Sequence, residues 1–277
     1  MRYFLGLMLV AACAPAFESP LSAASLDGLK IHSTVTGTGS KTVILVHGYT
    51  CDETTWTEQT RALEKQYRVV TLDLPGHGKS DSPKDGKFSM DLFARAIEAV
   101  RAEVNSERVV LVGHSMGTPV VLRYAHLYPA RVSALVFVDG LMPLPPAQTA
   151  AMANQGAAMA GPNGRAAREA MVRRFFVAGT TPEVQTKVLN MMLGAPEATA
   201  VGAMNATWEP AGQTTDIPMV PILGIYASPG LASEQAVHAA FPWVEYTSIP
   251  GTGHFLMLEK PEEFNRLLLA FLARQKY

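Results

Sequence analysis

Cysteine and net charge are both scarce in this sequence. Cys13 and Cys51 are its only cysteines, so they cannot build a disulfide framework or a cysteine-based zinc cluster. The 23 Lys and Arg residues nearly balance the 24 Asp and Glu residues, which leaves a formal net charge of -1. Neither nucleic acid nor an acidic membrane surface is therefore an expected partner, and no protein partner is indicated. With 277 residues, 48% of them hydrophobic, the chain can form one large α/β domain with an insertion.

The N-terminal apolar run, from Tyr3 to Ala12, is too short to span a bilayer as a mature helix. It follows Arg2 and precedes small residues, which is the layout of a secretory signal peptide, predicted over residues 1–24. A lipoprotein signal that ends before Cys13 is the alternative, because Val-Ala-Ala-Cys resembles a lipobox. Both predict export, to the periplasm or as a secreted protein, and a lipid on Cys13 would be the only link to a membrane.

A complete phosphate-binding loop is also lacking. Gly78-Lys79-Ser80 resembles the end of the G-x-x-x-x-G-K-S pattern, but the first glycine of that pattern would have to stand at Asp73. Nucleotide binding is therefore not expected.

Short apolar segments rich in β-branched residues recur through residues 25–140 and resume in residues 214–277. They include KTVILV (41–46), RVVTL (68–72), RVVLV (108–112) and VSALVFV (132–138). Segments with helical periodicity separate them. Strands that are apolar on both faces indicate a parallel sheet with helices on both sides. The predicted fold class is α/β, with a doubly wound and mostly parallel sheet.

Residues 141–213 have a different character, because the strand-like runs disappear and Ala and Met dominate. Eight of the 13 methionines lie between Met142 and Met219. Thr181-Pro182-Glu183 is a good helix start, with a Thr cap and Pro at the first helical position. We predict an all-helical cap inserted between two strands of the sheet. A cap over the carboxyl ends of the strands would line the pocket there, and flexible Met side chains would make that pocket apolar and adaptable.

The segment Gly113-His114-Ser115-Met116-Gly117 matches the G-x-S-x-G pattern in its required context, between a buried strand and a helix. The tight turn leaves no room for side chains two residues either side of Ser115, and it presents the serine hydroxyl at the end of the sheet. This motif predicts Ser115 as a nucleophile.

A serine hydroxyl needs a base to take its proton. His254 is the best placed histidine, in the loop Gly251-Thr252-Gly253-His254 just after the final predicted strand. All strands of a parallel sheet end on the same side, so this loop can reach Ser115. His114 and His77 are expected to serve local packing.

Acyl transfer also needs N–H donors for the oxyanion. The backbone N–H of Met116, which follows the nucleophile, is one candidate. The backbone N–H of Tyr49, in the loop His47-Gly48-Tyr49 after an earlier strand, is the second. Because a peptide N–H is not removed by mutation, the two side chains are not expected to be essential.

These segments, in this order and spacing, resemble the α/β-hydrolase superfamily from about Leu26 to the C-terminus. They are LVHGYTCDETTW, LDLPGHGKSD, LVGHSMGTPVVLRYA, LVFVDG and GTGHFLMLEKPEEFN. The resemblance is weakest across the predicted cap. It implies a Ser–acid–His triad, a cap domain and no cofactor. It implies an ester or similar acyl substrate only loosely, because this fold hosts many chemistries.

The position of the triad acid departs from the common pattern of the family. The usual Asp follows the strand that here reads VPILGIYA, but no carboxylate stands there before Glu234. Asp139, at the end of the preceding strand, is the favoured candidate, and haloalkane dehalogenases resemble this arrangement. Glu234 is the alternative, and the acid could also be absent. Asp139 could instead only cap the turn before the cap domain, as an Asp-Gly pair does well.

The sequence thus predicts a serine hydrolase for a small or medium hydrophobic carboxylic ester, with Ser115, His254 and Asp139 as its triad. A lactonase, a C–C bond hydrolase and a cofactor-free haloperoxidase are the alternatives among enzymes. Dehalogenase and epoxide-hydrolase chemistry is disfavoured, because those two families resemble this one but carry Asp where Ser115 stands. A ligand-binding protein that kept the fold and lost the triad acid is the alternative of another class.

Overall fold

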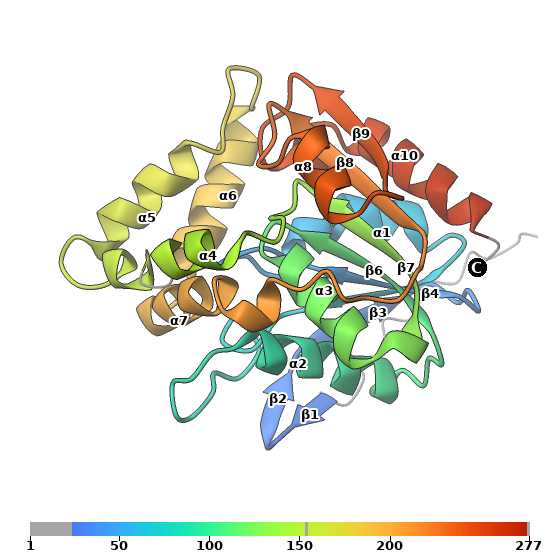
Figure 1. Cartoon of the computed structure of the whole chain (residues 1–277), viewed down its shortest axis with the longest axis horizontal. Helices are drawn as coiled ribbons and strands as arrows, with labels where there is room; N and C mark the ends of the chain where they lie inside the picture. Colours follow the sequence, from blue (N-terminus) through green and yellow to red (C-terminus); the bar gives the residue numbers. More distant parts are fainter. Residues whose placement is uncertain (1–23, 153–154, 276–277) are drawn as a thin grey trace, which may run out of the picture.

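The computed structural model describes residues 24–152 and 155–275 of the chain. A seven-stranded sheet forms its centre, in the order β3-β5-β4-β6-β7-β8-β9 (Figure 1). The strands are β3 (Ser33–Thr36), β4 (Thr42–Val46), β5 (Arg68–Leu72), β6 (Val109–His114), β7 (Val132–Val138), β8 (Ile222–Ser228) and β9 (Glu245–Pro250). Only β3 runs antiparallel to its neighbour, and every other pair is parallel. The predicted α/β class with a mostly parallel sheet is confirmed.

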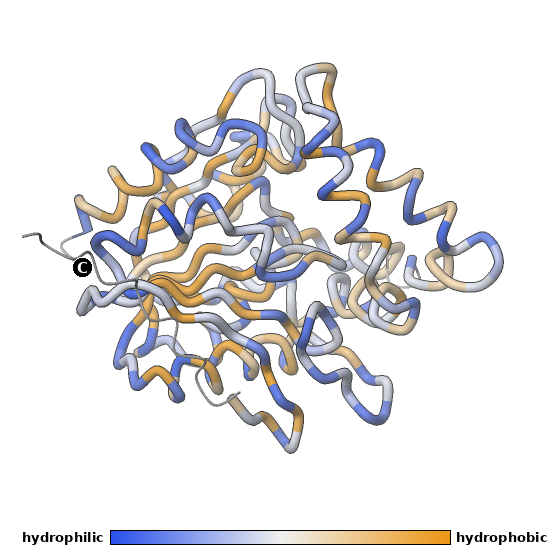
Figure 2. Tube along the Cα trace, turned by 180° about the vertical axis from the view of Figure 1, so that it is seen from behind, coloured by the Kyte–Doolittle hydropathy of each residue, from blue (hydrophilic) through white to orange (hydrophobic). Residues whose placement is uncertain are grey.

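The sheet is the core of the molecule because its central strands are apolar on both faces. Every residue of β4 and β6 is buried, and the strands stand out as a hydrophobic centre in Figure 2. Helix α2 (Met90–Glu103) packs against α3 (Gly117–Leu127), and α1 (Thr57–Leu63) packs against α10 (Pro261–Arg274). Ser89 caps α2 by accepting a hydrogen bond from the N–H of Leu92. Helices on both faces explain why these strands lack a polar side.

A two-stranded hairpin precedes the sheet, made of β1 (Ala24–Leu26) and β2 (Leu29–Ile31). Ala24, the last residue of the predicted signal segment, is buried in β1 opposite Ile31. Cys13 and the rest of that segment lie outside the described residues, so the leader, its lipid and export stay predictions. In the described part of the chain, no helix is long and apolar enough to cross a membrane.

Helices fill the chain between β7 and β8, where the sequence predicts the cap (Figure 1). They are α4 (Pro146–Met152), α5 (Gly164–Arg173), α6 (Pro182–Gly194) and α7 (Glu197–Thr207), with 3-10 turns η3 (Gln155–Met159) and η4 (Pro210–Gly212). Thr181 caps α6 as predicted, by accepting a hydrogen bond from the N–H of Val184, with Pro182 at the first helical position. Helix α5 packs against α6, and η3 packs against α7. This group of helices is called the cap below.

Candidate active site

Ser115 lies in a tight turn between β6 and α3, with a left-handed backbone at φ +54°. Its N–H donates to the Val138 carbonyl at 3.0 Å, and its own carbonyl accepts from the N–H of Thr118 at 3.0 Å. A Cβ on Gly117 would stand 2.6 Å from the Val46 carbonyl oxygen, so this position has room only for glycine. The turn therefore fixes Ser115 at the carboxyl end of the sheet, as the motif predicts.

His254 lies in the loop that follows β9, and its imidazole meets Asp139. The Nδ1–H of His254 donates to Oδ2 of Asp139 at 2.7 Å. The two side chains are only 4% and 2% exposed. A buried carboxylate in this contact fixes the tautomer of the imidazole and leaves Nε2 as the atom that can accept a proton.

Asp139 directly follows β7, and its backbone is also left-handed, at φ +39°. Its second carboxylate oxygen, Oδ1, accepts the N–H of Ala227 at 3.2 Å and the N–H of Leu231 at 3.1 Å. Both donors belong to the end of β8 and the loop after it, where the common family pattern would place the acid. This loop lacks a carboxylate and instead orients the carboxylate of the neighbouring strand.

Glu234, the alternative acid, is not brought to His254. It lies in the first turn of α8 (Glu234–Ala240) with a side chain that is 66% exposed. Its nearest ion-pair partner is Nε2 of His238, at 3.7 Å. The geometry thus joins Asp139, and not Glu234, to the predicted base.

Two segments outside the motifs hold the His254 loop. The N–H of His254 donates to the carbonyl of Phe175 at 3.0 Å, and the two rings lie 4.4 Å apart. Oε2 of Glu259 accepts the N–H of Gly253 at 2.9 Å and the hydroxyl of Thr180 at 3.2 Å. Phe175 and Thr180 belong to the cap, so the cap holds the histidine loop in place. No motif in the sequence signals these contacts.

The buried His114, His77 and Cys51 are poorly suited to act as base or nucleophile. His114 is fully buried, which lowers the pKa of its imidazole well below the usual value, and the nearby His254 lowers it further. Its Nε2–H donates to the His254 carbonyl at 3.0 Å. Burial lowers the pKa of His77 to about 3 and raises the pKa of the Cys51 thiol. These residues therefore serve packing and support.

A cavity of about 240 Å³ lies against Ser115, Tyr49 and Met116. Its remaining lining is mostly apolar and comes largely from the cap, including Met171, Phe175, Met204 and Trp208. Methionines of the cap thus line the cavity, as predicted. No hydrogen bond joins the Ser115 hydroxyl to His254 within the described residues, and this contact is often long in enzymes without substrate.

The loop after β4 brings Tyr49 to the tight turn that holds Ser115. The Nδ1–H of His47 donates to the Gly48 carbonyl at 2.8 Å, which stiffens the loop. A Cβ on Gly48 would stand 3.1 Å from the Cβ of Ser115, so this backbone passes directly beside the serine. The Tyr49 hydroxyl donates to the carbonyl of Ala200 in the cap at 2.8 Å. Tyr49 is thereby held at the cavity that Ser115 lines.

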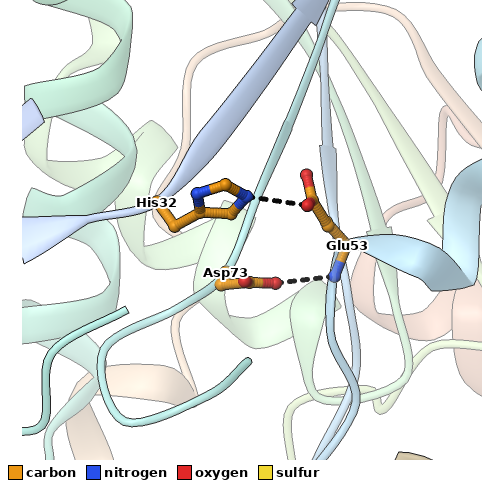
Figure 3. Close-up of side chains that lie close together, drawn as sticks. All are labelled: His32, Glu53 and Asp73. Atoms are coloured by element: carbon orange, nitrogen blue, oxygen red, sulfur yellow. Dashed lines mark hydrogen bonds and ion pairs between the residues drawn. The ribbon is translucent and has the colours of Figure 1, made fainter. Parts of the chain in front are cut away.

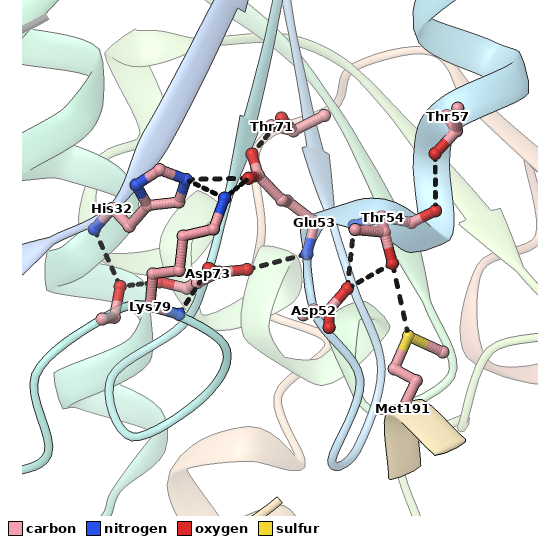
Figure 4. A network of polar contacts seen from close by, with 10 residues as sticks. His32, Asp52, Glu53, Thr54, Thr57, Thr71, Asp73, Lys79 and Met191 are labelled. Atoms are coloured by element: carbon pink, nitrogen blue, oxygen red, sulfur yellow. Dashed lines mark hydrogen bonds and ion pairs between the residues drawn. The ribbon is translucent and has the colours of Figure 1, made fainter. Parts of the chain in front are cut away.

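Three side chains with metal-ligand chemistry cluster away from this cavity (Figure 3). Each of His32, Glu53 and Asp73 offers one ligand atom, and these three atoms lie within 4.8 Å of one another. Lys79 lies among them, with Nζ 3.1 Å from Oε1 of Glu53 and 3.3 Å from Nε2 of His32 (Figure 4). Both Asp73 oxygens accept backbone N–H groups, from Glu53 and Lys79. Because the Lys79 ammonium pairs with Glu53 and each Asp73 oxygen already accepts a backbone N–H, we interpret this cluster as a structural network and assign no metal to it.

Comparison with known proteins places the chain in a family. Residues 41–183 match the family model described as alpha/beta hydrolase fold, which is more than half of the chain. The chain belongs to this family, as the motifs predict.

Relatives with assigned activities differ in what they do. A 2-hydroxy-6-oxononadienedioate/2-hydroxy-6-oxononatrienedioate hydrolase of Escherichia coli is 36% identical over 116 residues, and the match spans 40% of each chain. Among solved structures, a thermophilic esterase from Thermogutta terrifontis has a TM-score of 0.81 and 26% identity, covering 94% of this chain and 99% of its own. A bromoperoxidase from Bacillus anthracis has a TM-score of 0.75 and 26% identity, covering 88% and 96%. The family relationship thus indicates a hydrolase and leaves the substrate open.

Proposed function

We propose that this protein is a serine hydrolase that cleaves a small or medium hydrophobic carboxylic ester. The observation that carries the proposal is the buried 2.7 Å contact between His254 Nδ1 and Asp139 Oδ2. A mostly apolar cavity that Ser115 lines accompanies it. The similarity to a solved esterase over 94% of the chain supports the reaction class.

In the proposed mechanism, Oγ of Ser115 attacks the ester carbonyl while Nε2 of His254 takes the hydroxyl proton. The carbonyl oxygen becomes an oxyanion and accepts the backbone N–H groups of Tyr49 and Met116. Asp139 stabilises the imidazolium that forms. His254 then gives its proton to the departing alcohol, which leaves an acyl group on Ser115. Water, deprotonated by His254, hydrolyses this acyl-enzyme.

Turnover of nitrophenyl esters of increasing acyl length tests this proposal. Ser115→Ala should abolish both turnover and labelling by a fluorophosphonate probe. Asp139→Asn should lower kcat by up to about 10⁴-fold, because the imidazole loses its tautomer and its counter-charge. Glu234→Gln is the matched control and should keep the wild-type rate. Absence of turnover at every acyl length, together with absence of labelling, would contradict the proposal.

A C–C bond hydrolase is the second candidate, and the identity of 36% to the nonadienedioate hydrolase over 116 residues favours it. The same wild-type and Ser115→Ala proteins, incubated with 2-hydroxy-6-oxononadienedioate, separate the two candidates. Loss of the dienol absorbance, faster than ester turnover, would favour this second function. A ligand-binding protein without catalysis is disfavoured as an alternative. That alternative depends on the loss of the triad acid, whereas the carboxylate of Asp139 contacts His254.

A further inference from the structure

One formal charge stands in the lining of the Ser115 cavity. Among the described residues that line it, Arg174 is the only one with an ionised side chain, and no carboxylate accompanies it. The surrounding wall is mostly apolar. The Arg174 side chain is solvent-exposed, so we expect its attraction for an anion to depend on the salt concentration.

The three arginines of α5, which precede Arg174, all have hydrogen-bond or ion-pair partners. Arg165 and Arg168 each donate a hydrogen bond to a backbone carbonyl at the end of α6, at 3.0 and 3.1 Å. Arg173 pairs with Glu169, at 2.7 Å. Within the described part of the chain, Arg174 has no hydrogen bond or ion pair of its side chain. Its guanidinium is therefore available to a ligand.

Arg174 is also the chain neighbour of a residue that contacts the proposed base. It follows directly on α5 and precedes Phe175, whose ring lies 4.4 Å from the ring of His254. Trp208 lines the same cavity, and its indole Nε1 is buried without a hydrogen-bond partner among the described residues. The cap thus contributes to the lining of the Ser115 cavity an arginine and a tryptophan whose polar side-chain groups have no partner among the described residues.

We propose that the substrate carries a carboxylate and that Arg174 binds it while Ser115 attacks the carbonyl. This inference rests on the proposed ester hydrolysis and names its substrate class. The planar guanidinium can donate two parallel N–H bonds to a carboxylate, which a neutral ester cannot exploit. Because the cavity measures only about 240 Å³, the carboxylate is separated from the scissile carbonyl by a short chain.

Matched esters test the proposal, with the anion placed on either side of the scissile bond. Mono-4-nitrophenyl glutarate carries a carboxylate where 4-nitrophenyl pentanoate has a methyl group, and 4-(pentanoyloxy)benzoate carries it on the alcohol side. In Arg174→Gln, kcat/KM for one of the anionic esters, relative to the pentanoate, should fall about ten- to hundredfold, mainly through KM. Arg174→Lys should lose less, because it keeps the charge.

Arg173→Gln is the control, because Arg173 is not in the cavity lining, and it should keep the wild-type ratio of anionic to neutral turnover. High salt should lower the wild-type ratio, because Arg174 is solvent-exposed and salt screens its charge. An equal loss for anionic and neutral esters in Arg174→Gln, or an unchanged ratio for both anionic esters, would overturn the proposal while the ester hydrolase stands. Failure of wild type to cleave any of the three esters counts against the proposed function itself.

Discussion

Two residues of the candidate site hold backbone conformations that side chains usually avoid. Ser115 and Asp139 both have positive φ, and they directly follow the adjacent parallel strands β6 and β7. Such conformations cost on the order of 1–3 kcal/mol each and persist only where the surroundings hold them. Here the Ser115 N–H donates to Val138, and the Asp139 N–H donates to Ile225 at 2.9 Å. The strain is thus offset by backbone hydrogen bonds across three neighbouring strands.

Gly117→Ala tests the tightness of this turn. The added Cβ would meet the carbonyl oxygens of Val46 and His47 at 2.6 and 2.8 Å, so we expect a loss of about 1–3 kcal/mol in unfolding free energy. Fluorophosphonate labelling of Ser115 should slow as well. Gly194→Ala is the control, because a Cβ there meets no atom within 4 Å. Equal melting temperatures for the two variants would contradict the expectation.

At the scale of elements, the sheet and the positions of the candidate site residues follow from the sequence, but the cap contacts do not. Apolar runs ending at Ser115 and Asp139 identify strands, and the carboxyl ends of parallel strands share one edge of a sheet. The sequence therefore predicts Asp139 at the same edge of the sheet as the His254 loop, and the two side chains are 2.7 Å apart in the structure. The cap offers only helical periodicity, which does not tell which helix face meets the sheet. The contact of Phe175 with His254 and the position of Arg174 depend on that packing.

Glu259, in α9 (Leu256–Glu259), is expected to act as a positioning residue for His254. Glu259→Ala removes the acceptor shared by Gly253 and Thr180, so the histidine loop should lose its fixed orientation. We expect kcat to fall about tenfold with little change in KM, because the interaction serves the transition state.

Glu259→Gln keeps an acceptor oxygen and should restore most of this loss. Glu262→Ala, an exposed change in the first turn of α10, is the control and should match wild type. Initial rates over a range of nitrophenyl ester concentrations give both constants. A rise in KM without a fall in kcat would show that Glu259 serves binding instead.

At the scale of the whole molecule, the network around Glu53 joins segments that are far apart in the sequence. Burial alone would raise the pKa of the Glu53 carboxyl, but hydrogen bonds from Thr34, His32 and Lys79 outweigh it and lower the pKa to about 2, from an ordinary 4.5. A carboxyl with a lowered pKa stabilises the fold above its unfolded pKa. That contribution is lost as the pH falls from about 4.5 toward 2.

Glu53→Gln should therefore destabilise the protein at pH 7 by about 1–2 kcal/mol, a figure that allows for solvent screening of Lys79. The difference from wild type should shrink as the pH drops below about 4.5 and vanish near pH 2. Urea unfolding at a series of pH values measures it. Glu58→Gln removes only an exposed pair with Arg61 and is the control. A difference that stays constant from pH 7 to pH 3 would contradict this account.

The hydrogen bond from the His254 N–H to the Phe175 carbonyl has a consequence for protein engineering. Transplanting a cap from another family member, in order to change the preferred substrate, would also exchange the segment on which the histidine loop rests. Chimeras with foreign caps would then lose turnover because the histidine loop is displaced, and not because the substrate fits the new cap poorly. Grafts that retain residues 175–180 of the recipient and exchange only the helices around them would keep selectivity and catalytic rate separable.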